Sequence, residues 1–316
     1  MDTRPVAGTG LELTRIVAGA SPIPVARGVD LLNEAAEAGI AALDAGTLGT
    51  GETAAERWLE ERDGEGVVVL AAVGGTADAG RGMDLSAVRV THDLSAASRR
   101  LGRLDLPWLR GPDTETRLED TLAPIAAALE ERRIRSYGAG GFDAWQLEAL
   151  LATADRTGLP APSFLRVRLN LLDRGAERDL LPLATGAGLA VLAAAPLAAG
   201  RLTDRHVADE EAAEQAARAS QEPRATPTDH DLARLIAIRD LARARDLSTS
   251  ALAIAWLLGH PAVAAAVVAP RAAAEWDWVH EALASSLGDD ELDRLNTLPC
   301  TAAPARASPA GMWWSA

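Results

Sequence analysis

Short apolar segments alternate along the chain with longer amphipathic segments at a fairly regular spacing. The clearest apolar segment, "GVVVLAAVG" (66–74), is a continuous run rather than an alternation of apolar and polar residues. Such runs are typical of strands that a parallel sheet buries on both faces. We expect eight strands, at residues 13–19, 40–44, 66–74, 105–113 (a short strand running into a turn), 134–141, 163–170, 189–196 and 262–269.

The segments between these strands have the spacing and end signals of helices. Gly39 and Gly158 stand where two of them should end, and Ser or Asp residues precede two others as caps. We expect helices at residues 29–39, 52–62, 93–104, 121–133, 144–158, 229–247 and 248–260, with two more after the eighth strand. Eight strand–helix units predict an α/β fold, the (β/α)8 TIM barrel, formed by one domain over residues 1–316.

Composition narrows the class of protein further. The 316 residues carry a net charge of −14, which disfavours nucleic acid or an anionic membrane as partner. The single cysteine, Cys300, excludes an intramolecular disulfide and any cysteine-based metal site, and no clustered histidines or HExxH motif suggest a metal. The N-terminus lacks the pattern of a signal peptide. We therefore expect a cytoplasmic protein that uses no metal and forms a monomer or small homo-oligomer.

A single carboxylate, Asp44, ends the second expected strand, in "ALDAGTLGTGET" (42–53). Active sites of (β/α)8 barrels are built at the carboxyl ends of the strands. Asp44 is therefore the first candidate for a functional side chain, although the sequence places no obvious partner beside it.

Five stretches of the chain resemble the aldo-keto reductase family, in the correct order and at barrel spacing. They are "AGIAALDAGTLGTGE" (38–52), "RLGRLDLPWLRGPD" (100–113), "RRIRSYGAGGFDAWQLEAL" (132–150), "LAVLAAAPLAAGRLT" (189–203) and "ALAIAWLLGHPAV" (251–263). The resemblance covers residues 9 to 298 and implies the same barrel fold. It also implies NADPH-dependent carbonyl reduction as the ancestral chemistry.

The residues that perform this chemistry in the family are a Tyr, a Lys, an Asp and a His. Only the Asp is retained here, as Asp44, while the Tyr, Lys and His positions fall on Leu48, Ala72 and Arg110. The chain contains no lysine, and its only tyrosine, Tyr137, belongs to the expected fifth strand. General acid–base catalysis by the family's residues is therefore not expected.

The cofactor positions of the resemblance are only partly retained. The residues that hold the nicotinamide amide in the family are replaced by Gly140, Gly141 and Arg166. The adenine-contacting pair is replaced by Trp278 and Val279. The positions that contact the phosphates are retained, at Leu197, Gly200, Leu202 and Arg271. We expect that no cofactor is used, with residual NADP binding as the alternative.

A cationic pocket at the mouth of the barrel is the second candidate feature. Arg166 and Arg168 lie two apart on one strand and share a face, which points either into the barrel or outward to the helices. If they face inward, they join Arg110 in a pocket for an anionic substrate. Arg110 itself either restores the ion pair that Asp44 lost with the lysine or binds an oxyanion through its planar donor fork.

Tryptophans offer apolar walls for the same pocket. Trp108 lies on the expected fourth strand, and Trp313 and Trp314 end the chain in "GMWWSA". In the resemblance the C-terminal tail, here residues 299–316, folds over the barrel mouth, so these two residues would form an aromatic lid. The polar segment at about 201–228 is expected to be a long loop.

These features leave three functions open. The leading hypothesis is a non-redox enzyme, a lyase, dehydratase, isomerase or cyclase, that acts on a small anionic or polyoxygenated metabolite. Asp44 would move a proton, and Arg110 would stabilise an enolate or carboxylate. The alternatives are an inactive protein that binds NADP or a metabolite, and an atypical NADPH-dependent oxidoreductase. A cavity around Asp44 and Arg110 favours new chemistry, whereas a mouth filled by side chains favours an inactive scaffold.

Overall fold

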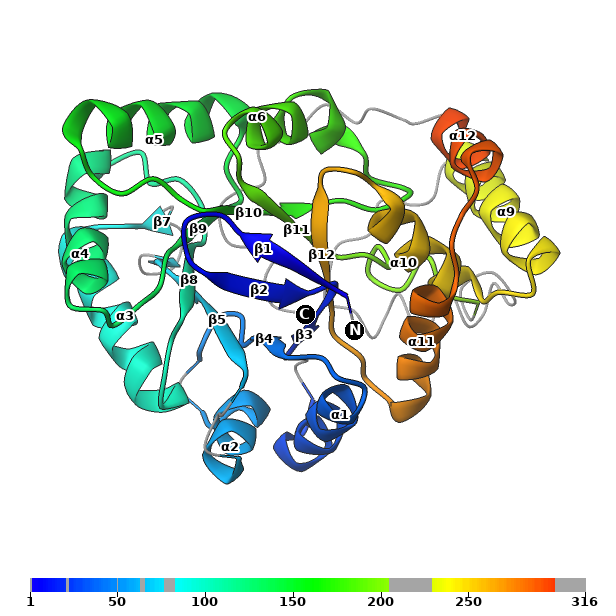
Figure 1. Ribbon diagram of the computed structural model, residues 1–316, viewed down its shortest axis with the longest axis horizontal. Helices are drawn as coiled ribbons and strands as arrows, with labels where there is room; N and C mark the ends of the chain where they lie inside the picture. The colour runs from blue at the N-terminus through cyan, green and yellow to red at the C-terminus, as the bar shows by residue number, and fades with distance from the viewer. Residues whose placement is uncertain are drawn as a thin grey trace.

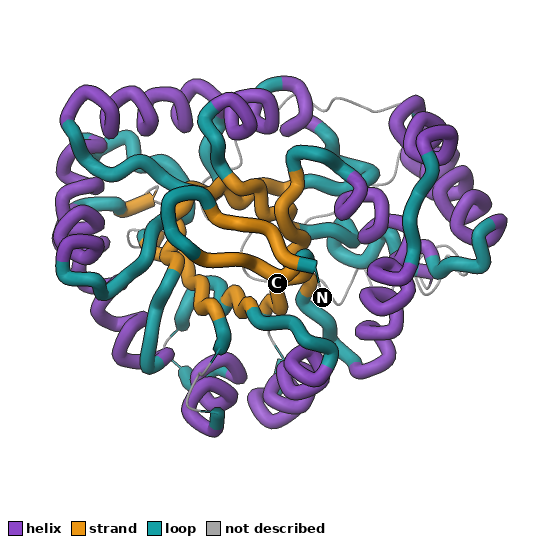
Figure 2. Tube along the Cα trace, in the orientation of Figure 1, coloured by secondary structure: helices purple, strands orange, loops and turns teal. Residues whose placement is uncertain are grey.

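The computed structural model describes residues 2–20, 23–49, 51–62, 66–76, 83–204 and 229–298, without the side chains of residues 229–232. Eight parallel strands form a closed barrel in the order β10-β11-β12-β3-β4-β5-β8-β9, which confirms the predicted (β/α)8 fold. Figure 2 shows the ring of strands enclosed by helices. The barrel strands are β3 (Ile16–Gly19), β4 (Ala42–Asp44), β5 (Val68–Val73), β8 (Leu106–Leu109), β9 (Gly138–Gly140), β10 (Phe164–Arg168), β11 (Ala190–Ala194) and β12 (Val263–Val268).

The helices pack against the outside of this ring. They bury one hydrophobic layer against the outward faces of the strands, as the amphipathic pattern requires. They are α1 (Val25–Glu37), α2 (Ala54–Glu61), α3 (Ala87–Leu101), α4 (Leu118–Glu130), α5 (Ala144–Thr157), α6 (Leu180–Gly186), α9 (Asp229–Ala244), α10 (Thr249–Gly259), α11 (Trp276–Ala284) and α12 (Asp289–Thr297), with short 3-10 helices η1 (Gly175–Arg178) and η2 (Ala273–Glu275).

The expected first strand at residues 13–19 is divided into two. Its first part belongs to β2 (Leu11–Thr14), which pairs antiparallel with β1 (Thr3–Val6), and only β3 enters the barrel. The break falls at Arg15, whose guanidinium turns away to donate to the carbonyls of Val263 and Ala264. In Figure 1 the β1–β2 hairpin lies across one end of the barrel.

The interior of the barrel is filled by side chains from alternate positions of the strands. Hairpin residues Val6 and Leu13 join this interior cluster with residues from the start of β4, β8 and β10, so the hairpin closes the amino-terminal end. Two rings, Trp108 and Phe164, are the largest members and are almost fully buried. The carboxyl ends of the strands lie at the opposite end, where the site is expected.

Glycines on β9 make room for these two rings. A Cβ atom at Gly138 would lie 2.3 Å from the ring of Phe164, and one at Gly140 would lie 2.9 Å from the ring of Trp108. The "GAG" sequence that ends the expected fifth strand therefore reflects packing inside the barrel. Any side chain larger than hydrogen at Gly138 would collide with the ring.

Other departures from the expected elements are small. Helix α3 begins at Ala87, six residues before the expected start, with Ser86 as its cap: its hydroxyl accepts a hydrogen bond from the backbone N–H of Arg89. A short antiparallel pair, β6 (Gly75–Thr76) and β7 (Met83–Asp84), follows β5 and was not expected from the pattern. Most of the expected loop at 201–228 and the whole tail at 299–316 lie outside the described residues.

Candidate functional site

The mouth of the barrel holds a closed cluster of three side chains: Asp44, Trp108 and Arg166. Asp44 ends β4 and is only 2% exposed. One of its carboxylate oxygens accepts hydrogen bonds from the backbone N–H of Gly46 (2.9 Å) and from the Trp108 indole N–H (3.3 Å). Its other oxygen accepts from Nε of Arg166 at 2.9 Å. We call these three residues the Asp44–Trp108–Arg166 cluster.

A cation–π contact completes this cluster. The guanidinium carbon of Arg166 lies 4.5 Å from the centroid of the Trp108 ring. Arg guanidinium groups stack favourably on aromatic faces, and more so where water is excluded. Trp108 thus supports both members of the ion pair, the carboxylate through its N–H and the guanidinium through its ring face.

The alternation of side chains along the strands explains why Arg166 reaches Asp44. Phe164 and Arg166 lie on the same face of β10, and Phe164 is part of the barrel interior, so Arg166 faces inward one layer higher. On β4, Ala42 and Asp44 follow the same rule. The inward-facing alternative for the Arg166 side chain is therefore the correct one.

One of the two alternatives for Arg110, an ion pair with Asp44, is wrong, because Arg166 is the ion-pair partner of Asp44. Arg110 lies one residue beyond β8, above Trp108, and the Trp108 ring occupies the position on this strand next to the carboxylate. The backbone of Arg110 is fixed from two sides. The backbone N–H of Arg110 donates to the carbonyl of Val73 at 3.1 Å. On the other side Gly141 lies close, since a Cβ there would be 2.8 Å from the carbonyl oxygen of Arg110.

The Arg110 side chain is buried without an anionic partner among the described residues. It is 9% exposed, and its Nε atom has no hydrogen-bond partner. Burial lowers the pKa of the Arg110 guanidinium, and the neighbouring charge of Arg89 lowers it further. The charge of Arg89 is itself paired, with Asp93, at 2.8 Å.

The expected pocket of three arginines is reduced accordingly. Arg166 is paired with Asp44, and Arg168 is paired with Asp173, with 2.8 Å between Nε and the carboxylate. The Arg168–Asp173 pair is partly exposed, whereas the Asp44–Arg166 pair is buried. Arg110 is the member of the trio that lacks an acid partner in the described part of the chain.

The positions of the family's proton-transfer residues hold apolar side chains. Leu48 packs against the hydrophobic layer under the helices, and Ala72 packs against the interior cluster. Tyr137 immediately precedes β9, and its hydroxyl donates to the carbonyl of Pro160 at 2.9 Å. Burial raises the pKa of Tyr137 above its ordinary value, so this phenol is held as a neutral core residue.

The residues at the nicotinamide positions do not fit the amide group of that cofactor. Gly140 and Gly141 have no side-chain donors, and Gly141 has a φ of 70°, which favours glycine. Arg166, at the third of these positions, is engaged by Asp44 and Trp108.

The phosphate positions keep a distinct backbone. In the loop that follows β11, Ala195, Ala198 and Ala199 have positive φ angles of 54°, 49° and 56°, and Gly200 has 86°. Successive backbone N–H groups in such loops can form anion-binding concavities. Within the predicted set, Leu202 is fully buried in the core, while Leu197 and Gly200 are partly buried.

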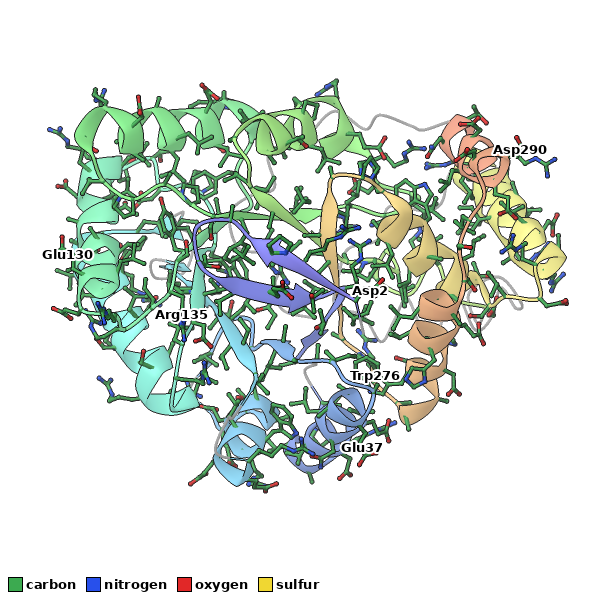
Figure 3. All side chains as sticks on the ribbon, viewed as in Figure 1. Asp2, Glu37, Glu130, Arg135, Trp276 and Asp290 are labelled. Carbon is green, nitrogen blue, oxygen red and sulfur yellow. The ribbon has the colours of Figure 1, made fainter. Side chains whose placement is uncertain are left out.

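Arg271, the remaining phosphate position, is exposed two residues before η2. Its backbone N–H donates to the Glu275 carboxylate at 2.8 Å. The adenine positions are apolar, and Val279 is fully buried. Trp276, labelled in Figure 3, joins helices α11 and α1: its indole N–H donates to the carbonyl of Leu31 at 3.0 Å.

Several expectations fall outside what the structure describes. Trp313 and Trp314, the predicted aromatic lid, lie in the tail beyond residue 298. Among the described residues, no group of three or more His, Cys, Asp or Glu side chains is arranged to hold a metal ion. The described helices include none that is long and apolar enough to cross a membrane.

Sequence reasoning also missed residues that shape the site. Arg89 was not a candidate, because it lies in a helix whose expected start was placed too late. Gly75 was not one either, although a Cβ there would lie 2.0 Å from a guanidinium nitrogen of Arg89. The signal for both is the "GG" at 74–75 directly after β5, where a bulky group from another element must lie close to the backbone.

Comparison with known proteins places this architecture in a family. The model of the aldo/keto reductase family matches residues 15–298, and the chain therefore belongs to that family. It is 27% identical over 179 residues to a versiconal hemiacetal acetate reductase of Aspergillus parasiticus, covering 56% of this chain and 52% of that protein. It is 24% identical over 216 residues to the uncharacterized oxidoreductase YrpG of Bacillus subtilis, covering 68% of this chain and 64% of that protein.

A third relative is the NADH-specific methylglyoxal reductase of Escherichia coli, at 28% identity over 125 residues, 38% of this chain and 36% of that protein. In each comparison the match spans less than two thirds of the relative. These relatives are named as reductases or oxidoreductases. Because the matches are partial, the comparisons support a shared fold and family.

Proposed function

We propose that this chain is an aldo/keto reductase barrel that no longer reduces carbonyls and instead binds a small anionic or polyoxygenated metabolite without a nicotinamide cofactor. The observation that carries the proposal is the Asp44–Trp108–Arg166 cluster. The one carboxylate of the ancestral tetrad is neutralised by a guanidinium and hydrogen bonded by two further N–H groups.

This arrangement favours a structural role for Asp44 at the carboxyl end of the barrel over a role in proton transfer. In the family the Lys–Asp pair acts on a tyrosine, and here Ala72 and Leu48 stand at the Lys and Tyr positions. Removing a buried carboxylate from its ion pair costs several kcal/mol. Asp44 is therefore better suited to holding Arg166 and Trp108 in place than to taking a proton from a ligand.

A non-redox reaction of the lyase, dehydratase, isomerase or cyclase type is the second candidate. The observation that favours it is Arg110, a buried cation at the rim without an acid partner among the described residues. Such a group suits stabilisation of an enolate or carboxylate. In this reading Asp44 would act only after Arg166 turns away from it.

A calorimetric titration of the purified chain with NADPH, and separately with NADH, tests the absence of a nicotinamide cofactor. No saturable heat is expected at micromolar concentrations, because Gly140, Gly141 and Arg166 provide no free side-chain group to bind the nicotinamide amide. The variant Arg271→Ala serves as the control for the phosphate end. Micromolar binding of NADPH that Arg271→Ala weakens at least tenfold would contradict the proposal and point to nucleotide binding.

A further inference from the structure

A second feature of the mouth lies outside the Asp44–Trp108–Arg166 cluster. It is the edge between the loop that follows β5 and the residue that follows β8. Arg110, the residue after β8, reaches this edge; it is 9% exposed and its Nε atom has no hydrogen-bond partner. A buried guanidinium in this condition lacks both a counter-charge and part of its hydrogen bonding among the described residues.

A second cation stands at the same edge. The guanidinium of Arg89, from the first turn of α3, lies directly over Gly75, where a Cβ would be 2.0 Å from one of its terminal nitrogens and 2.8 Å from the other. The charge of Arg89 acts on Arg110 and lowers its pKa. The two like charges repel each other at the rim, and an anion beside Arg110 would reduce that repulsion.

Two described carboxylates close to this edge already accept hydrogen bonds. Asp93 accepts from Nε of Arg89 (2.8 Å) and from the backbone N–H of Gly74 (3.1 Å), and lies 3.0 Å from Nδ1 of His92. Asp113, just beyond Arg110, accepts from the backbone N–H groups of Leu85, Glu115 and Thr116. Neither carboxylate is paired with Arg110.

We infer that Arg110, assisted by Arg89, forms a binding site for an oxyanion, a carboxylate or phosphate group of a small molecule. The inference rests on the proposed function, which supplies the small-molecule ligand. It adds the chemical group of that ligand that the protein binds. A planar guanidinium suits this task, because it donates two parallel hydrogen bonds to a carboxylate or phosphate. The anion supplies the counter-charge that the described residues do not.

Thermal unfolding in the presence of simple anions tests the site. The wild-type chain would be unfolded in chloride, acetate, inorganic phosphate and sulfate at one constant ionic strength. Acetate or phosphate is expected to raise the wild-type Tm by about 5 °C at a concentration of a hundred times Kd. The larger shift identifies the group, acetate for a carboxylate ligand and phosphate or sulfate for a phosphorylated one.

Two methionine variants separate this effect from the general stabilisation that excluded salts cause. Arg110→Met is expected to lose the anion-dependent shift and to unfold in chloride at a Tm equal to or above that of the wild type, because it removes an uncompensated buried charge. Arg168→Met, whose arginine is paired with Asp173, is expected to keep the full shift.

The inference is overturned if no anion shifts the wild-type Tm beyond the shift in Arg110→Met, or if Arg110→Met unfolds several degrees lower in chloride. The second result would mean that Arg110 has a structural partner. The proposed function fails under a different observation, namely NADPH-dependent turnover of a carbonyl compound. That turnover would leave an Arg110-dependent anion shift standing as a property of the site.

Discussion

Replacing Arg166 with methionine is expected to lower the free energy of unfolding by about 3–5 kcal/mol, the usual cost of leaving one member of a buried ion pair alone. Asp44 would keep its hydrogen bonds from Gly46 and Trp108 but lose its counter-charge in a position that is 2% exposed. Methionine fills a similar volume, so packing changes little. Urea denaturation at neutral pH, followed by circular dichroism, measures the effect.

The same strand provides the matched control. Arg168→Met removes an arginine two residues along β10, on the same face, from the partly exposed pair with Asp173. Exposed pairs contribute about 0–1 kcal/mol, so this variant should be close to wild type. The double variant Asp44→Asn/Arg166→Met should recover part of the loss, because neither charge remains. Equal losses for Arg166→Met and Arg168→Met would contradict the cluster as described.

Replacing Trp108 with alanine is expected to lower the free energy of unfolding by about 3–5 kcal/mol, the range for a large buried aromatic residue. Three losses combine here: the ring that fills the barrel interior, the N–H donated to Asp44 and the surface on which Arg166 stacks. Gly140 packs against this ring and has no side chain that could fill the space left by its removal.

Trp145 is the control for this second variant. It is 69% exposed on α5, and Trp145→Ala should change the free energy of unfolding by about 0.5 kcal/mol or less. Chemical denaturation of both variants under one condition gives the comparison. A loss of under about 1 kcal/mol for Trp108→Ala would mean that Trp108 neither fills the interior nor supports the ion pair.

The sequence was sufficient for the fold, because the strands are short continuous apolar runs and the helices carry clear end signals. The sequence was insufficient where two strands follow each other in one continuous stretch of strand-forming residues. The residues Leu11–Thr14 and Ile16–Gly19 are both apolar enough to be strands, and only the side chain of Arg15, bonded to carbonyls at the end of α10 and the start of β12, separates them. A pattern along the chain cannot show a contact of this range.

The candidate site was predicted in part. Asp44 at the rim follows from its place at the end of an apolar strand, and Arg166 and Trp108 were both among the candidates. Their arrangement was not predictable, because strand alternation says which residues share a face but not which long side chain crosses the barrel. Trp108 determines which arginine pairs with Asp44, because its ring stacks with Arg166 and occupies the place beside the carboxylate.

The most direct test of the central claim, that this barrel no longer reduces carbonyls, is NADPH oxidation at 340 nm by the purified chain with a panel of aldehydes, ketones and dicarbonyl compounds. No oxidation above the rate without protein is expected, because the structure positions no proton-donating Tyr–Lys pair near Asp44 in the described part of the chain. A carbonyl-dependent rate that disappears in the variant Asp44→Asn would contradict it and restore the reductase function.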